Sequence, residues 1–69
     1  MSKHSVLVIG CGSIGERHLR CFQKTGRAVV TACESNAALL QKMVATYGVE
    51  GRSDWQAAVR EPFDVVVIC

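Results

Sequence analysis

The sequence predicts an α/β fold in which strands and helices alternate in the order β-α-β-α-β-α-β around a doubly wound parallel sheet. Two observations support this prediction. Short apolar runs typical of buried strands alternate with segments of helical periodicity. The connections between them are short, and a strand that returns through a helix to a neighbouring strand builds a parallel sheet.

Length and composition indicate one small folded unit. The chain has 69 residues, of which 49% are hydrophobic and 20% charged, so it is not a disordered tail. Eight basic and six acidic residues give a net charge of +2, which is too small and too scattered for a nucleic-acid surface. No apolar run approaches the ~20 residues of a membrane span.

The amino-terminal stretch, residues 1–5, leads into only four apolar residues, 6–9. A secretory signal needs an apolar region of roughly 7–15 residues. We therefore expect a cytoplasmic protein that binds neither membrane nor nucleic acid.

The first strand and helix are predicted from residues 6–25. Residues 6–9 form an unbroken apolar run, typical of a strand buried on both faces. Ser13 and Glu16 have the spacing of a capping box at the start of the helix, and Gly26 suits its end. One side of this helix is expected to carry the packing residues Ile14, His18, Cys21, Phe22 and Thr25.

Residues 28–33 read as a second strand, and Ser35 or Asn36 can cap the helix that follows. An apolar stripe with i, i+3, i+4, i+7 spacing predicts the buried face of that helix, and Gly48 closes it. The stripe consists of Leu40, Met43, Val44 and Tyr47, with the Tyr47 hydroxyl expected to reach water.

The rest of the chain predicts one very short strand, one short helix and one apolar strand. The short strand covers residues 49–52, and Ser53 with Gln56 again has capping-box spacing. Trp55, at the start of the helix, is expected in the core or at a helix contact. Residues 65–69 form the last strand.

In the doubly wound strand order 3-2-1-4-5-6 this last strand would be the fourth, which is normally flanked on both sides. Natural sheet edges carry charge, proline or bulges, whereas residues 65–69 are all apolar. We therefore expect residues 1–69 to be the amino-terminal part of a larger dinucleotide-binding domain.

The glycine pattern between the first strand and helix, residues 10–15, matches G-x-G-x-x-G in the strand–turn–helix context that a dinucleotide requires. Gly10 permits the sharp turn, Gly12 lets a pyrophosphate approach the backbone, and Gly15 allows close helix packing. The first-turn amides, at Ser13 and Ile14, point at the anion with the helix dipole behind them. The fold is thus predicted to be of the Rossmann type, first half only.

Glu34 completes the predicted cofactor site. It ends the second strand, 19 positions after Gly15, close to the expected spacing of about 20. A carboxylate there accepts hydrogen bonds from the adenosine ribose hydroxyls and repels the 2′-phosphate of NADP. Since Ser35 and Asn36 supply no cation for that phosphate, NAD is favoured over NADP.

With these residues placed, the chain resembles the amino-terminal NAD(P)-binding domain of the Gfo/Idh/MocA family of oxidoreductases. The resemblance rests on residues 6–19, with His18 three positions after the last glycine, on the Ser-Asp-Trp-Gln stretch at 53–56, and on residues 63–69. It implies hydride transfer between a nicotinamide cofactor and a sugar, inositol or polyol.

The resemblance also implies what this chain does not contain. In the family the catalytic lysine lies in a later Glu-Lys-Pro motif, and Lys3, Lys24 and Lys42 have no such context. We therefore assign no catalytic residue and expect an absent α+β domain to bind the small-molecule substrate. The complete protein is expected to be a homo-oligomer, and the 69-residue chain alone to be inactive.

Two other functions remain open from the residues alone. Nucleotide-sensing regulatory domains share the glycine turn and the acidic strand end, and FAD-binding domains also place Glu after their second strand. Against FAD stand Glu16, Arg17 and His18, because flavin domains usually have small residues there. The four cysteines lack a metal-ligand spacing, so we predict no metal site and four ordinary small apolar residues: Cys11, Cys21, Cys33 and Cys69.

Overall fold

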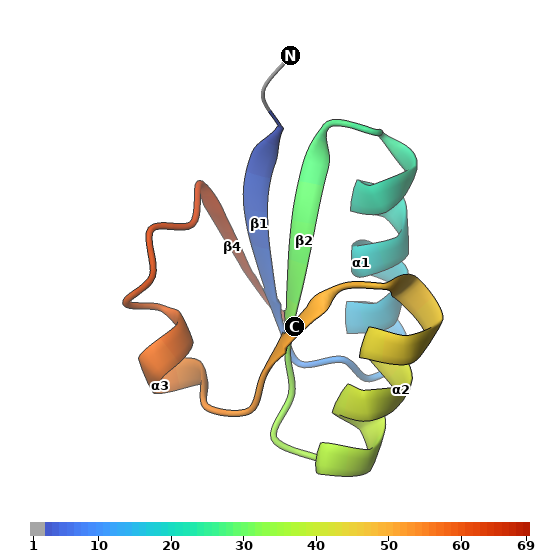
Figure 1. Ribbon diagram of the computed structural model, residues 1–69, viewed down its shortest axis with the longest axis vertical. Coiled ribbons are helices and arrows are strands. Elements are labelled where there is room, and N and C mark those ends of the chain that lie inside the picture. Colours follow the sequence, from blue (N-terminus) through green and yellow to red (C-terminus); the bar gives the residue numbers. More distant parts are fainter. Residues whose placement is uncertain (1–2) are drawn as a thin grey trace.

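The computed structural model of the chain describes residues 3–69, so Met1 and Ser2 of the stretch considered above as a signal lie outside the described residues. Four strands alternate with three helices, as predicted. The elements are β1 (His4–Ile9), α1 (Ser13–Lys24), β2 (Ala28–Cys33), α2 (Ala37–Tyr47), β3 (Glu50–Arg52), α3 (Trp55–Ala58) and β4 (Val65–Ile68) (Figure 1).

The strands form one parallel sheet in the order β3-β2-β1-β4, which confirms the predicted doubly wound topology. Val6 of β1 pairs with Val30 of β2 on one side and with Val65 of β4 on the other. Because all strands are parallel, their carboxyl ends meet at one edge. The chain changes direction across the sheet between β1 and β4, which is where ligands bind in such sheets.

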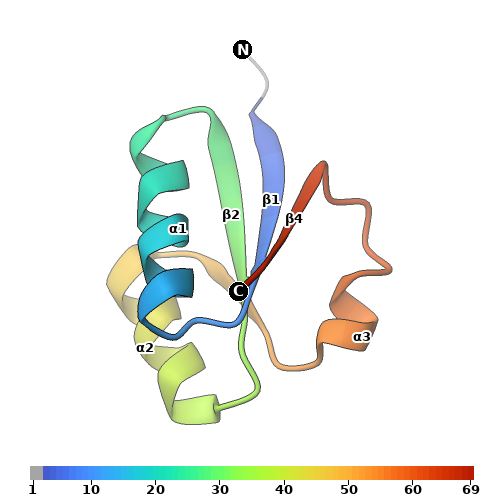
Figure 2. The same cartoon turned by 180° about the vertical axis from the view of Figure 1, so that it is seen from behind.

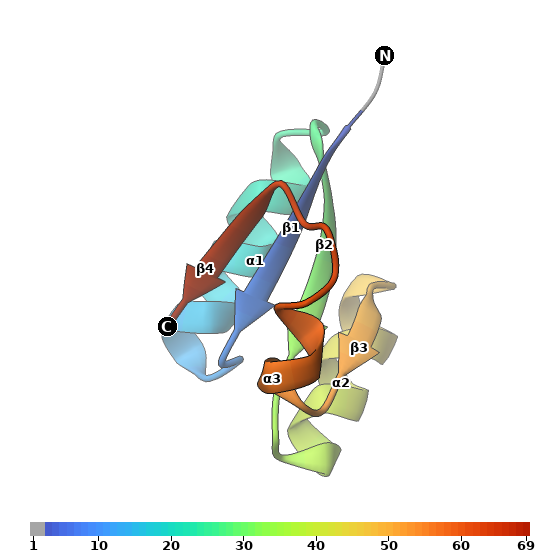
Figure 3. The same ribbon diagram turned by 90° about the vertical axis from the view of Figure 1, so that its left-hand side faces the viewer.

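The helices form a layer on each face of the sheet. Helices α1 and α2 cover one face, and α3 lies on the other (Figures 1 and 2). The side view shows α1 and α2 behind the strands and α3 in front of them (Figure 3). The edge with the carboxyl ends is therefore flanked by α1 on one face and by α3 on the other.

The central strand β1 is buried on both faces, as its unbroken apolar run predicted. Val6 and Val8 belong to the core cluster that Leu19 of α1 and Met43 of α2 complete. Leu7 points to the opposite face. It packs there with Cys33 and Ala58.

The packed face of α1 differs from the predicted one. Its buried residues are Gly15 and Leu19, with Phe22 packed against the same cluster. Ile14 is 65% exposed, and His18 is exposed as well. Helix α1 approaches the rest of the fold most closely at Gly15, which has no side chain. Apolar periodicity therefore does not indicate this position.

The predicted capping box at α1 is also wrong. Gly12 is the residue before the helix and no side chain caps it. The Glu16 carboxylate instead accepts a hydrogen bond from the Tyr47 hydroxyl of α2 at 2.5 Å. The Tyr47 hydroxyl therefore contacts α1, and this bond joins the two helices on the same face of the sheet.

Side-chain caps are present at the other two helices. Asn36 caps α2, as one of the two candidates predicted, by accepting the Leu39 N–H at 3.1 Å. At α3 the cap is Asp54, which accepts the Gln56 N–H at 3.0 Å, so the prediction of Ser53 was wrong by one residue.

The cysteines divide into two groups, and all four are free thiols. Cys11 and Cys33 are buried, as expected of small apolar residues, whereas Cys21 and Cys69 are exposed. Burial raises the pKa of Cys11 to about 11, and the nearby Glu34 carboxylate acts in the same direction. Within residues 3–69 no group of three His, Cys, Asp or Glu is placed to hold a metal ion.

None of the helices in the described part of the chain has both the length and the apolar character that crossing a membrane requires.

Candidate functional site

The site is built on the turn that connects β1 to α1. Gly10 leaves the strand with a φ of +90°, a conformation that residues with a side chain rarely adopt. Its N–H donates to the Cys33 carbonyl at 2.8 Å, which fixes the turn against the end of β2. A Cβ at Gly10 would also lie 3.0 Å from the Cys69 carbonyl oxygen, so the end of β4 closes the turn from the other side.

Gly15 allows α1 to lie directly on this turn. A Cβ at Gly15 would be 1.7 Å from the carbonyl oxygen of Gly10, a distance that no arrangement of the present backbone permits. The sequence predicted a close approach of the helix to the sheet. The contact is in fact with the turn that leaves β1, so it sets the position of the helix terminus relative to the glycines.

Gly12, in contrast, faces open space. A Cβ there would meet no atom within 4 Å. The first backbone hydrogen bond of α1 runs from the Glu16 N–H to the Gly12 carbonyl at 2.8 Å. The amides of the first turn, including those of Ser13 and Ile14, precede this bond and have no acceptor within the helix. The backbone therefore presents donors and the positive end of a helix dipole to the space beside Gly12.

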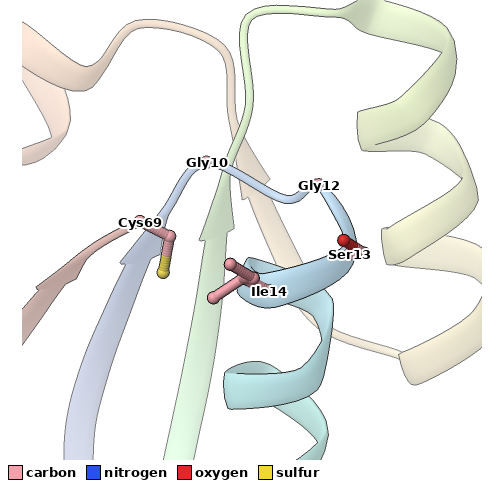
Figure 4. A pocket seen from close by; sticks show the side chains of 6 residues that line it. Gly10, Gly12, Ser13, Ile14 and Cys69 are labelled. Carbon is pink, nitrogen blue, oxygen red and sulfur yellow. The ribbon is translucent and has the colours of Figure 1, made fainter.

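A cavity of about 260 Å³ occupies that space. Figure 4 shows it at the amino end of α1, with the Ile14 side chain extending toward Cys69 at the end of β4. Five of the six predicted site residues come together here. The lining consists of Gly10, Gly12, Ser13, Ile14, Gly15 and Cys69.

Glu34, the sixth predicted residue, lies beside this cavity rather than in it. Its carboxylate accepts the Cys11 N–H at 2.9 Å and the Asn36 N–H at 2.8 Å, one with each oxygen. It lines a second cavity of about 110 Å³ that also touches Gly10. One carboxylate therefore joins the glycine turn to the loop after β2 and still faces a cavity.

These two backbone donors fix the charge of Glu34. The N–H groups of Asn36 and Cys11 hold the pKa of this carboxyl below its ordinary value, because they stabilise the charged form. Glu34 is thus an anion at neutral pH, which makes it a stronger hydrogen-bond acceptor.

The lowered pKa predicts how stability depends on pH. The contribution of Glu34 is complete above the ordinary value of 4.5 and is lost as the pH falls through its lower value in the folded protein. Urea unfolding at about pH 7 and about pH 3 should show wild-type stability declining toward acid, and Glu34→Gln should show a smaller decline.

Glu50→Gln is the matched control, because in the described residues that carboxylate meets only the Arg52 side chain, at 3.5 Å. It should reproduce the wild-type decline between the two pH values. An unchanged decline in Glu34→Gln would show that the ionisation of Glu34 does not contribute to the loss of stability in acid.

The structure adds lining residues that the sequence analysis did not assign to the site. Cys69 borders the first cavity, and Ser35, Ser53 and Trp55 border the second. All of them follow the carboxyl end of a strand. The predicted parallel topology, which places these ends at one edge, was the signal that could have indicated them.

Trp55 also corrects a prediction. It was expected in the core or at a helix contact, but its exposed fraction is 55%. The short helix α3 buries Ala58 against the sheet instead.

Comparison with known proteins supports the Rossmann-type fold described above. Residues 4–69 match a family model, GFO_IDH_MocA, described as an oxidoreductase family with an NAD-binding Rossmann fold. No curated protein sequence matches the chain.

Two solved structures have the same fold. The WlbA dehydrogenase from Chromobacterium violaceum, in complex with NADH and UDP-GlcNAcA, is 24% identical over 99% of this chain, with a TM-score of 0.85. The WlbA dehydrogenase from Bordetella pertussis, with the same two ligands, is 26% identical over 97% of this chain, with a TM-score of 0.82. The chain spans 21% of the length of each enzyme.

Proposed function

Because the chain belongs to the GFO_IDH_MocA family of oxidoreductases, which has an NAD-binding Rossmann fold, we propose that its glycine turn and Glu34 hold the adenosine diphosphate half of NAD. Residues 1–69 would be the amino-terminal part of the dinucleotide-binding domain. The observation that carries the proposal is the open space at Gly12, where helix amides face a cavity beside an ionised carboxylate.

The pyrophosphate fits the first cavity by both shape and charge. Only a residue without a side chain leaves the backbone at position 12 open to a ligand, and Gly12 is such a residue. Amides such as those of Ser13 and Ile14 offer hydrogen bonds that strengthen when the acceptor is charged. The side chains of the turn add no positive charge, so the backbone itself would bind the anion.

The ribose would lie between the two cavities, against Glu34. Each carboxylate oxygen of Glu34 already accepts one backbone N–H and has a further lone pair to offer a hydroxyl. A 2′-phosphate at this position would place a second negative charge beside Glu34. The resulting repulsion favours NAD over NADP.

The chemistry of the complete protein would be hydride transfer. The nicotinamide ring, when bound, supplies the hydride acceptor or donor, and the protein supplies its orientation. We assign no catalytic residue to this chain, and the substrate would bind to an α+β domain outside it. The WlbA dehydrogenase from B. pertussis was solved with UDP-GlcNAcA, which favours a sugar-like or related polyol substrate. The family description favours this activity over nucleotide sensing and over FAD binding.

Titration of the purified protein with NADH, NADPH and FAD tests the proposal. NADH should bind most tightly, and Glu34→Ala should weaken its binding by about 1–3 kcal/mol because a charged hydrogen-bond acceptor is lost. Glu50→Ala, at the far end of the neighbouring β3, should bind NADH as the wild type does. Tighter binding of NADPH or of FAD, or an unchanged affinity in Glu34→Ala, would contradict the proposed site.

A further inference from the structure

Trp55 is the feature that the proposed site leaves without a role. It is the single tryptophan of the chain and one of its most apolar side chains, yet more than half of it is exposed. The short helix that it begins is anchored by Ala58, which is 1% exposed. The fold therefore holds the backbone of α3 against the sheet while the indole stays outside the core.

The exposed indole lies at the carboxyl edge of the sheet, next to the ribose acceptor. Trp55 and Glu34 line the same cavity of about 110 Å³. Trp55 also lines a neighbouring cavity of about 260 Å³, whose other walls are Ile9 at the end of β1 and Ile68 at the end of β4. The indole thus stands between an ionised carboxylate and an apolar hollow.

The positions of α1 and Glu34 determine the direction in which a bound nucleotide would cross the edge of the sheet. The pyrophosphate would lie at the amino end of α1, and the ribose at Glu34. The base is attached to the opposite side of the ribose from the phosphate, so it would leave Glu34 away from α1. That is the side of the sheet on which α3 lies, as the side view shows (Figure 3).

We infer that the indole of Trp55 forms one wall of the adenine pocket and stacks on the base, with the apolar hollow at Ile9 and Ile68 beneath it. The inference rests on the proposed function. A purine is a flat, weakly polar ring system, and aromatic side chains bind it through their faces without needing a specific hydrogen-bond pattern. The cavity formed by Ile9, Trp55 and Ile68 has the corresponding apolar walls, and the polar residues Glu34, Ser35 and Ser53 lie in the adjoining cavity.

The test uses ADP-ribose and NADH as probes, since ADP-ribose contains adenine but no nicotinamide. Because Trp55 is the single tryptophan, its emission reports directly on the indole, and ADP-ribose should quench it in the wild type. Trp55→Ala should weaken both ligands about 5- to 150-fold, the range that loss of one base–aromatic stack gives. Trp55→Phe should stay within a few-fold of the wild type because phenylalanine also stacks.

Val59→Ala is the matched control. Val59 follows α3 directly, is 42% exposed and is not among the residues that line the two cavities. It should bind both ligands as the wild type does. If Trp55→Ala fails to fold, the wild-type emission and Trp55→Phe still decide the matter.

The outcomes separate the inference from the function on which it rests. A wild type that binds neither probe refutes the proposed cofactor site, and the inference with it. A wild type that binds both probes, with unquenched emission and unchanged affinity in Trp55→Ala, overturns only the role of Trp55. That second result would mean that the indole does not contact adenine.

Discussion

Gly15→Ala should destabilise the protein by at least about 3 kcal/mol. The added methyl group would lie 1.7 Å from the Gly10 carbonyl oxygen, so α1 must move away from the turn or the turn must break. Overpacking usually costs ~1–3 kcal/mol even when flexible side chains absorb it. Here the neighbour is backbone, and a domain of this size has only about 3–10 kcal/mol of stability in total.

Thermal or urea unfolding monitored by circular dichroism measures the effect. At neutral pH the variant should be largely unfolded, or should melt far below the wild type. Gly12→Ala is the control, because a methyl group there meets no atom within 4 Å. A Gly15→Ala protein that melts with the wild type would show that α1 does not lie on the turn as described.

Whereas Gly15→Ala acts on folding itself, Gly12→Ala is expected to leave the protein folded but to abolish most of its NADH binding. Its stability should fall by no more than about 1 kcal/mol, the cost of a poor residue before a helix. The methyl group would occupy the space in which a pyrophosphate must approach the amides. Losing two charged hydrogen bonds at about 1.5–3 kcal/mol each predicts affinity reduced about 100-fold or more.

NADH titration together with a melting curve on the same sample gives both readouts. Ser35→Ala is a suitable comparison, since Ser35 borders the second cavity and not the first. It should bind NADH far better than Gly12→Ala. Unchanged NADH affinity in Gly12→Ala would place the pyrophosphate somewhere other than beside this glycine.

The fold was largely predictable because its signals are local and repeated. Residues 6–9 are apolar at every position, which indicates burial on both faces, and alternation with helices then determines a parallel sheet. The face of α1 was not predictable in the same way. Apolar periodicity counts side chains, whereas this helix packs most closely at Gly15, which has none. Ile14 was therefore placed on the packed face although it is exposed.

The candidate site was predicted only in part. The glycine spacing and the position of Glu34 predicted six residues, which the structure places around two adjoining cavities, whereas Cys69, Ser35, Ser53 and Trp55 line the same cavities without having been predicted. The bonds from Glu34 to the Cys11 and Asn36 amides depend on how two loops approach each other. Trp55 was expected in the core or at a helix contact because of its hydrophobicity, whereas it is 55% exposed and Ala58 is the buried residue of α3.

The two amide contacts of Glu34 also constrain how such a protein can change its coenzyme. If Glu34 holds the ribose as proposed, replacing it with a small or basic residue would remove the repulsion toward a phosphorylated ribose. The same replacement would release the Cys11 amide and untie the loop after β2 from the glycine turn. Under the proposed function, a change of coenzyme at this position must therefore supply a new acceptor for the Cys11 amide, or the glycine turn will be held less firmly.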